Sequence, residues 1–102
     1  MSAVSEKGTL PIGVEADGKI YRAFEIRAAT LRDSVEAVDE CGGDASQTRL
    51  RYAVMARRVR FEGLDQEQVT TDLLMGMFDR DGVALEIAAD EVEKKLDALS
   101  SS

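Results

Sequence analysis

The sequence predicts an α+β fold: an N-terminal β-hairpin followed by three or four α-helices. Two patterns support this prediction. Residues 10–27 alternate between apolar and polar side chains on either side of Asp17-Gly18, a pair typical of turns between antiparallel strands. From Thr30 onward, apolar residues recur at intervals of three and four positions, as they do in amphipathic helices. Strands followed by a run of helices are typical of the α+β class.

The length of the chain predicts a single small domain. The 102 residues suit one folded unit with a modest hydrophobic core. We expect residues 1–7 to form a disordered N-terminal tail, residues 8–99 a single domain, and residues 100–102 a polar tail.

Charge and cysteine content restrict the partners and the compartment. The 13 basic and 20 acidic residues give a net charge of −7, which disfavours binding to nucleic acid and to anionic membranes. The first residues lack the pattern of a signal peptide, and no apolar run approaches the length of a membrane span. Cys41 has no second cysteine with which to pair. These features together predict a cytoplasmic protein.

The hairpin admits two registers. A two-residue turn at Asp17-Gly18 places Val14 opposite Tyr21 and divides the apolar residues between the two faces. A three-residue loop over residues 16–18 places Val14 beside Ile20 instead and gathers the apolar residues on one face. We therefore predict the three-residue loop, with its glycine in the left-handed conformation.

Two helices are predicted in the middle of the chain. The first begins after the N-cap Thr30, with Asp33 in its first turn, and ends at Gly42-Gly43. Its apolar residues at helical spacing are Leu31, Val35 and Val38. The second begins near Asp44 or Ser46 and runs to about Phe61, and two apolar sides place it between neighbouring elements. These sides consist of Leu50, Val54 and Phe61, and of Tyr52, Met55, Ala56 and Val59.

The C-terminal part of the chain offers several helix starts. Asp65 and Gln68 have the spacing of a capping box, and Thr70 could equally begin a short helix. Residues 79–82 form either a turn or a weak point within one longer helix. The final helix is expected over about residues 83–99. Its apolar stripe consists of Leu85, Ala88, Ala89, Val92, Leu96 and Leu99, beside an acidic row of Glu86, Asp90, Glu93 and Asp97.

The sequence contains no histidine, which removes the commonest general base and the usual Ser-His and Cys-His nucleophile pairs. One cysteine without histidine cannot supply the ligands of a structural zinc site. The carboxylates lie mostly at helical spacings of three and four, the pattern of a solvated surface. Cys41 is interpreted as a small apolar residue at a helix end. We therefore predict neither an enzyme nor a cofactor or metal site.

Five arginines with no acid between them occupy the second predicted helix: Arg49, Arg51, Arg57, Arg58 and Arg60. On a helix they form two groups on opposite sides, whereas a DNA-reading helix gathers its basic residues on one exposed face. We therefore interpret them as partners of acids on neighbouring helices, with stems that cover the core. A small DNA-binding or regulatory protein that uses residues 49–60 is the alternative function.

Some apolar residues remain after the core is assigned, and they indicate a surface for a protein partner. Methionines near a break adapt to partner surfaces, and Ile87 lies away from the main stripe of the final helix. The second half of that helix runs toward a polar tail, so association with a client or a second copy would cover it. The candidate partner-binding residues are Met75, Met77, Phe78, Ile87, Val92, Leu96 and Leu99.

Six short motifs occur once each, in a fixed order, along the chain. They are Leu10-Pro11, Phe24-Glu25-Ile26-Arg27, Ala29-Thr30 with Asp33, Gly63-Leu64, Leu73-Leu74, and Asp81 with Leu85 and Ala88. Together they resemble the small tail assembly chaperones of tailed phages, especially those of Mu-like phages and prophages. The resemblance covers about residues 8–90, and Asp81 stands four residues before the leucine where the family pattern has three.

The resemblance implies a non-enzymatic assembly factor that acts in the host cell cytoplasm. Chaperones of this family bind the long helical tape measure protein while the tail tube polymerises around it. The composition agrees with this role, because an acidic chain without histidine and with apolar residues left outside the predicted core suits a protein that binds other proteins.

Overall fold

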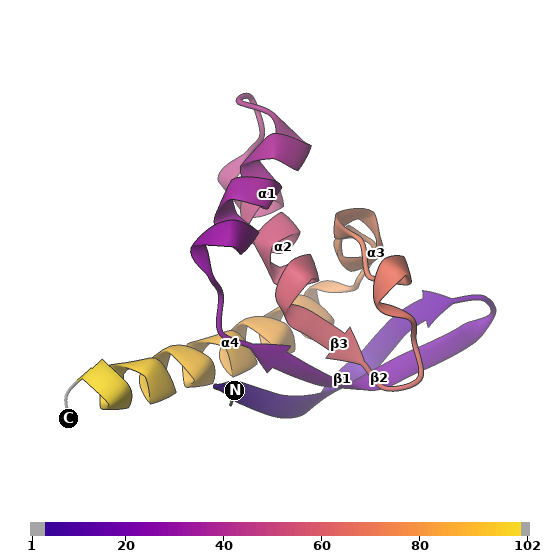
Figure 1. The fold of residues 1–102 in the computed structure, drawn as a ribbon. Coiled ribbons are helices and arrows are strands. Elements are labelled where there is room, and N and C mark those ends of the chain that lie inside the picture. The colour runs from indigo at the N-terminus through magenta and orange to yellow at the C-terminus, as the bar shows by residue number, and fades with distance from the viewer. Residues whose placement is uncertain (1–3, 101–102) are drawn as a thin grey trace.

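The structure, a computed structural model, describes residues 4–100 and confirms the α+β fold (Figure 1). An antiparallel sheet has the strand order β1-β2-β3, and four α-helices follow the N-terminal hairpin. The elements are β1 (Ser5–Ala16), β2 (Lys19–Arg27), α1 (Leu31–Cys41), α2 (Gln47–Arg58), β3 (Val59–Phe61), the 3-10 helix η1 (Gln66–Gln68), α3 (Thr71–Met75) and α4 (Asp79–Ser100).

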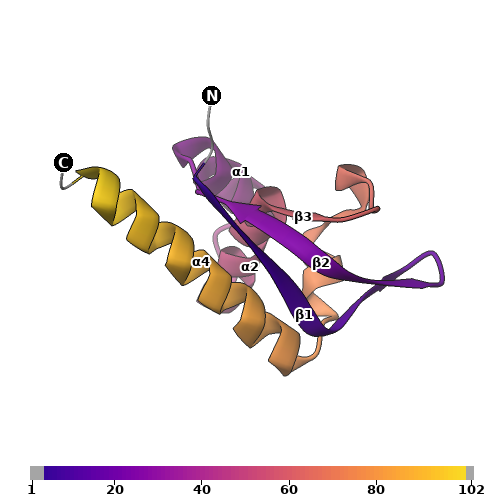
Figure 2. The ribbon, with the colours of Figure 1, turned by 90° about the horizontal axis from the view of Figure 1, so that it is seen from below.

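One face of the sheet forms the core with α2 and α4. Phe24 and Ile26 of β2 stand opposite Phe61 and Val59 of β3, and all four side chains are buried. Helix α4 runs along β1, so that it covers the edge strand of the sheet (Figure 2). The core residues from the two helices are Tyr52, Met55, Ala56, Leu85, Ala88 and Val92. No helix of residues 4–100 lies on the opposite face of the sheet (Figure 2), which leaves the polar side chains of that face in water.

The hairpin has the two-residue turn, so our prediction of a three-residue loop is wrong. Ala16 pairs with Lys19, and the turn residues Asp17 and Gly18 have φ angles of 55° and 77°. Two positive φ angles are typical of a type I′ turn. The register changes between Thr9 and Val14, where residues 10–13 of β1 form an irregular bulge opposite β2. The bulge, and not the turn, brings the apolar residues of β1 into the core.

The polar groups of this bulge are satisfied by two charged side chains from elsewhere. The fully buried carboxylate of Asp81 accepts hydrogen bonds from the backbone N–H groups of Ile12, at 2.8 Å, and Gly13, at 3.0 Å. The guanidinium of Arg22 donates to the carbonyl oxygens of Leu10, at 2.9 Å, and Pro11, at 3.0 Å. Backbone groups that leave the strand ladder need other partners, and Asp81 and Arg22 supply them here.

The expected N-terminal tail is corrected for residues 5–7, which belong to β1. Ser5 pairs with Arg27, and the Lys95 ammonium lies 2.8 Å from the carboxylate of Glu6. These contacts with β2 and α4 order a segment that we expected to be disordered because of its polar composition. Residues 1–3 lie outside the described part of the chain. At the other end, Ser100 belongs to α4, and residues 101 and 102 are not described.

The helix starts follow the predicted capping residues in part. Thr30 is the N-cap of α1, as predicted, and it forms a complete capping box with Asp33; Gly42 ends that helix. Thr70 caps α3, whereas Asp65 makes no side-chain capping hydrogen bond. Helix α4 begins at Asp79, four residues before the predicted start.

The predicted second helix is too long at its C-terminal end. Helix α2 ends at Arg58, and residues 59–61 form β3. The reason is tertiary pairing, since Val59 and Phe61 alternate with Arg60 and their backbone pairs with β2.

Gly18 tests the turn conformation. An added Cβ there meets no atom within 4 Å, so the cost of substitution comes from the positive φ alone. We expect Gly18→Val to lower the free energy of unfolding by about 1–2 kcal/mol, because a β-branched residue resists this conformation. The matched control is Gly43→Val, where the space is equally open, no positive φ occurs, and a change within about 0.5 kcal/mol is expected. Urea midpoints of the two variants that coincide would contradict this account of the turn.

Candidate protein-binding surfaces

Most arginines of the 49–60 segment pair with acids on neighbouring elements, as the sequence predicts. Arg57 lies 3.3 Å from Glu36 and 2.9 Å from Glu40, both of which belong to α1. The other pairs are Arg49 with Asp72 at 3.2 Å and Arg51 with Glu86 at 3.5 Å. These arginines therefore connect α2 with α1, α3 and α4 and leave no continuous basic face for DNA.

Arg58 is the most deeply buried of these arginines. Its Nε donates a hydrogen bond of 2.8 Å to the carbonyl oxygen of Arg27, while its Nη2 is buried and has no hydrogen-bond partner among the described residues. Burial lowers the pKa of Arg58, and the nearby carboxylate of Glu93 on α4 opposes this shift. The side chain thus places a positive charge between α2 and α4.

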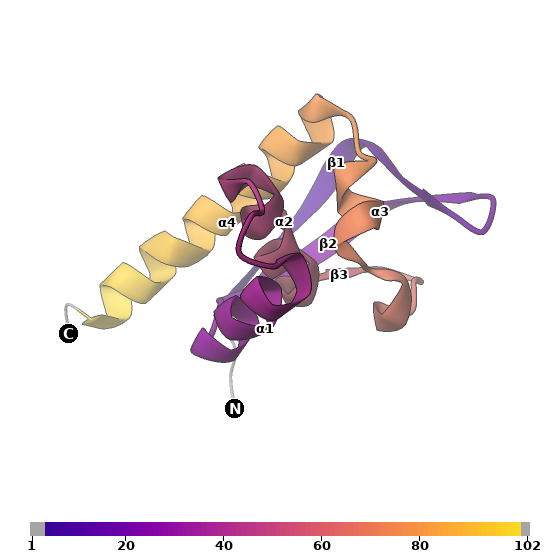
Figure 3. The same cartoon turned by 90° about the horizontal axis from the view of Figure 1, so that it is seen from above.

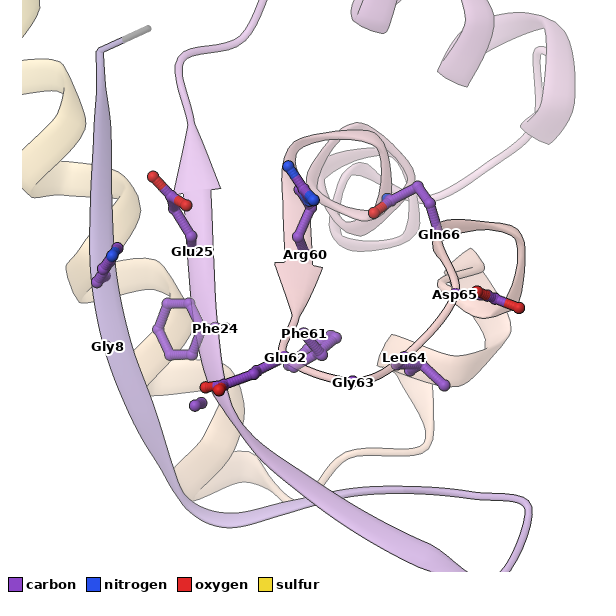
Figure 4. A pocket seen from close by; sticks show the side chains of 12 residues that line it. Gly8, Phe24, Glu25, Arg60, Phe61, Glu62, Gly63, Leu64, Asp65 and Gln66 are labelled. Atoms are coloured by element: carbon purple, nitrogen blue, oxygen red, sulfur yellow. The ribbon is translucent and has the colours of Figure 1, made fainter.

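The sheet face without a helix forms an open hollow of about 820 Å³ (Figure 4). Its floor includes the cross-strand neighbours Lys7, Glu25 and Arg60, and the loop of residues 62–66 forms one wall. Gly8, between Lys7 and Thr9, leaves room on the core side of β1 for the ring of Phe24, from which an added Cβ would lie 2.6 Å. Acidic and basic side chains alternate across this surface, which is the usual character of a solvated sheet face and favours no ligand class.

The described residues contain neither a metal-binding cluster nor a membrane-spanning helix. Within residues 4–100, no three acidic or cysteine side chains gather in a way that would hold a metal ion. No helix in that part of the chain combines the length and the apolar character required to cross a bilayer.

The seven candidate partner-binding residues differ in how far they are buried. Val92 is fully buried in the core, so its predicted contact with a partner is wrong. Met77 and Leu96 are half-buried and pack against the same core. The physical reason is that α4 runs along β1 (Figure 2), and this packing covers Val92 and part of Leu96.

Four candidates remain exposed but come from different places. They are Met75 in α3, Phe78 in the α3–α4 connection, and Ile87 and Leu99 on well-separated turns of α4, with exposed fractions of 42%, 64%, 58% and 62%. These side chains are accessible to a partner, but they do not form one continuous stripe.

Helix α1 carries its apolar side chains outward. Leu31 is 86% exposed, Val35 58% and Val38 48%, and the spacing of i, i+4 and i+7 places all three on one stripe. We call these three residues the α1 stripe. The buried residues of α1 are Asp33 and Ala37 on the opposite side. Helix α1 therefore adds no side chain to the main hydrophobic core, which reverses the usual arrangement of an amphipathic helix.

Polar contacts hold α1 in this orientation. The guanidinium of Arg27 donates to both carboxylate oxygens of Asp33, at 2.7 and 2.9 Å, and also to the carbonyl oxygen of Arg57 at 2.7 Å. The hydrogen bonds from Arg27 lower the pKa of Asp33 to about 2. At the other end of α1, the hydroxyl of Thr71 donates to Glu40 at 2.7 Å, and this bond lowers the pKa of Glu40. These acids must face inward, so the α1 stripe faces water.

The sequence contains a signal for this arrangement that the candidate set missed. Asp33, Glu36 and Glu40 share the side of the helix opposite the α1 stripe. Arg27 precedes the helix and Arg57 follows it, and both reach these acids. An acidic side facing arginines of another element indicates which side of a helix is inward.

Comparison of this chain with protein-family models, with curated proteins and with solved structures finds no match.

Proposed function

We propose that this chain is a non-enzymatic assembly factor whose client is the tape measure protein of a tailed phage. The resemblance of its motifs to tail assembly chaperones supports the identity of the client. The observation that carries a protein-binding role is the α1 stripe, an apolar stripe on a helix that the domain itself leaves uncovered. An apolar stripe at helical spacing is the surface on which another amphipathic helix packs.

The size of the stripe favours reversible binding. Full burial of an aliphatic side chain contributes about 1.5–3 kcal/mol, and the three residues of the stripe are partly covered already. Association also loses translational and side-chain freedom, which removes much of this gain. A contact of this size holds a client weakly enough to release it, which is what an assembly chaperone requires.

Val35→Asp tests the proposed function. We expect this change to weaken binding to purified tape measure protein at least tenfold, because it places a charge in an apolar contact. Stability should change by no more than about 0.5 kcal/mol, since Val35 is 58% exposed. The measurement is titration calorimetry with a melting curve beside it.

Val83→Asp is the matched control for this experiment. Val83 is also a valine in an α-helix with 58% exposure, but it lies on α4 and outside the α1 stripe. Its replacement should leave client binding unchanged. A wild-type protein that never binds the tape measure protein would contradict the proposal, and salt-sensitive binding to a DNA duplex would favour the alternative function.

A further inference from the structure

One margin of the α1 stripe is charged, and the other is small and uncharged. At 100° per residue, Arg32 and Asp39 lie on one side of the stripe, seven positions apart. Ser34 and Cys41 lie on the other side, also seven positions apart. Arg32 and Asp39 are exposed, and within residues 4–100 neither forms an ion pair. Both charges are therefore available to a partner.

The two charges of this margin lie at the unfavourable ends of α1. A helix favours acids in its first turn, where N–H groups are free, and bases in its last turn, where carbonyl groups are free. Arg32 is the second residue of α1, and Asp39 is the third from its end. A neighbouring helix of opposite direction and the same sequence would correct this, because it brings an acid to Arg32 and a base to Asp39.

Two copies of α1 are complementary in this antiparallel arrangement. The intervals of four and three residues in the α1 stripe are those of the core positions of a coiled coil. When Val35 of each copy packs against Val38 of the other, Arg32 of each copy comes next to Asp39 of the other. The twofold axis thus repeats both the apolar contact and the ion pair. The small residues of the other margin also meet across the axis and allow the helices to approach closely.

We propose that two copies of this chain associate through their α1 helices, packed antiparallel across a twofold axis. Helix α1 packs on α2 and lies at one edge of the molecule, where a second helix can lie along it (Figure 3). The contact surface is the α1 stripe with its two margins, and each margin faces its own equivalent. It consists of Leu31, Arg32, Ser34, Val35, Val38, Asp39 and Cys41.

The size and charge of the chain make this dimer weak. Helix α1 is about 16 Å long, and a stable dimer buries about 800 Å² on each partner, which is more than one short helix provides. The net charge of −7 also opposes association, although Glu36 and Glu40 pair with Arg57 and face away from the stripe. We therefore expect monomers at micromolar concentration and dimers near millimolar concentration.

Disulfide trapping tests the direction and register of the two helices. Measured along the helix axis, position 34 of one copy lies about 3 Å from Cys41 of the other. Ser34→Cys should therefore form, under mild oxidation, a covalent dimer with two disulfides, which a non-reducing gel detects. Within one chain the two positions are about 10 Å apart, beyond the reach of about 7 Å between the Cα atoms of a disulfide.

The wild type and the double variant Ser34→Cys, Cys41→Ser are the controls for trapping. Each has one cysteine per chain, which lies at least about 7 Å along the axis from its equivalent in the other copy. Sideways separation of the helices adds to this distance, so little covalent dimer should form. Equal trapping in a control and in Ser34→Cys would overturn the antiparallel register, and so would the absence of a covalent dimer in Ser34→Cys.

Exchange of the two charges tests the charged margin. Arg32→Asp and Asp39→Arg should each raise the dissociation constant of the dimer at least fivefold, because each places two pairs of like charges across the axis. Asp39→Arg is decisive, since it makes the chain less negative and would strengthen a dimer that only the overall charge opposes. The double variant with both changes should return to within about twofold of wild type.

Sedimentation equilibrium measures the four dissociation constants, and melting curves show that each variant folds. The double variant follows the preference of the helix dipole, so its melting temperature should be at least that of wild type. Tighter association of Asp39→Arg, or a folded double variant that does not recover, would overturn the proposed pairing.

The dimer does not rest on the proposed function, since these measurements need no client. A client helix on the α1 stripe would displace the second copy. A chain that stays monomeric at millimolar concentration and still binds the tape measure protein would overturn the dimer and leave the proposed function intact. A chain that forms the trapped dimer but never binds the tape measure protein would overturn the proposed client and support the dimer.

Discussion

Asp81→Ala is expected to lower the free energy of unfolding by about 3–5 kcal/mol, the largest effect of any substitution considered for this domain. The fully buried carboxylate accepts hydrogen bonds from the N–H groups of Ile12 and Gly13. Alanine removes both acceptor oxygens and leaves the two backbone donors of the bulge without their partner. The register of β1 depends on this bulge, so its loss would also displace Leu10 and Val14 from the core. Urea denaturation of the variant measures the effect.

Asp79→Ala is the control for Asp81→Ala. Asp79 also lies in the first turn of α4, but it is exposed. Its replacement should cost no more than about 1 kcal/mol, the contribution of an acid at a helix N-terminus. A similar loss in both variants would mean that Asp81 acts through the helix and not through the bulge.

Asp33→Asn is expected to lower the free energy of unfolding at neutral pH by about 2 kcal/mol. In the folded state the Arg27 guanidinium donates to both oxygens of this carboxylate, which lowers the pKa of Asp33 from 3.8 to about 2. The Arg27 side chain is 39% exposed, so water screens the pair and keeps the effect below that of a fully buried ion pair. Chemical denaturation at pH 7 gives the measurement.

The pH dependence of the same pair has a definite sign. Because the folded-state pKa of Asp33 is depressed, the unfolded chain binds its proton first as the pH falls. The stabilisation is therefore fully present above about pH 4 and is lost as the pH falls toward 2. Asp33→Asn should lack this part of the acid transition, whereas Asp39→Asn, an exposed change in the same helix, should retain it. If the free energy of unfolding fell with decreasing pH by the same amount in wild type and in Asp33→Asn, the pair of Asp33 and Arg27 would not be the source of this pH dependence.

Local patterns in the sequence were sufficient for the features that depend on neighbouring residues. The hairpin turns at Asp17-Gly18 and α1 begins after its N-cap Thr30, where the sequence places them, although the turn has two loop residues and not the predicted three. Each of these features needs only residues within a few positions of one another, so the sequence contains all of the interaction.

Features that depend on distant residues could not be predicted in the same way. The bulge in β1 needs Asp81, which lies 69 positions from Ile12. Strand β3 has three residues, too few for a period to be read, and it forms because β2 is available for pairing. Both errors therefore arise where a tertiary partner determines the local conformation.

The candidate surface was predicted only in part for a related reason. The sequence predicts that Val92 contacts a partner, because it does not show that β1 packs along α4 as far as this residue. The spacing of Leu31 and Val35 indicated a helix, but the side that faces inward depends on Arg27 and Arg57. Hydrophobic periodicity identifies an apolar stripe, and it does not show whether the domain or another molecule covers that stripe.

The pairing of the first strand with the last helix has a consequence for how the chain reaches its folded state. Lys95 donates to the carbonyl oxygen of Ser5, its partner 90 positions earlier in the chain. During synthesis from the N-terminus, the outer edge of β1 therefore stays exposed until the ribosome has produced α4. Contacts of such long sequence separation form slowly, because the ends of a long loop must first meet. During this interval the exposed strand edge is the part of the nascent chain most open to pairing with a neighbouring copy.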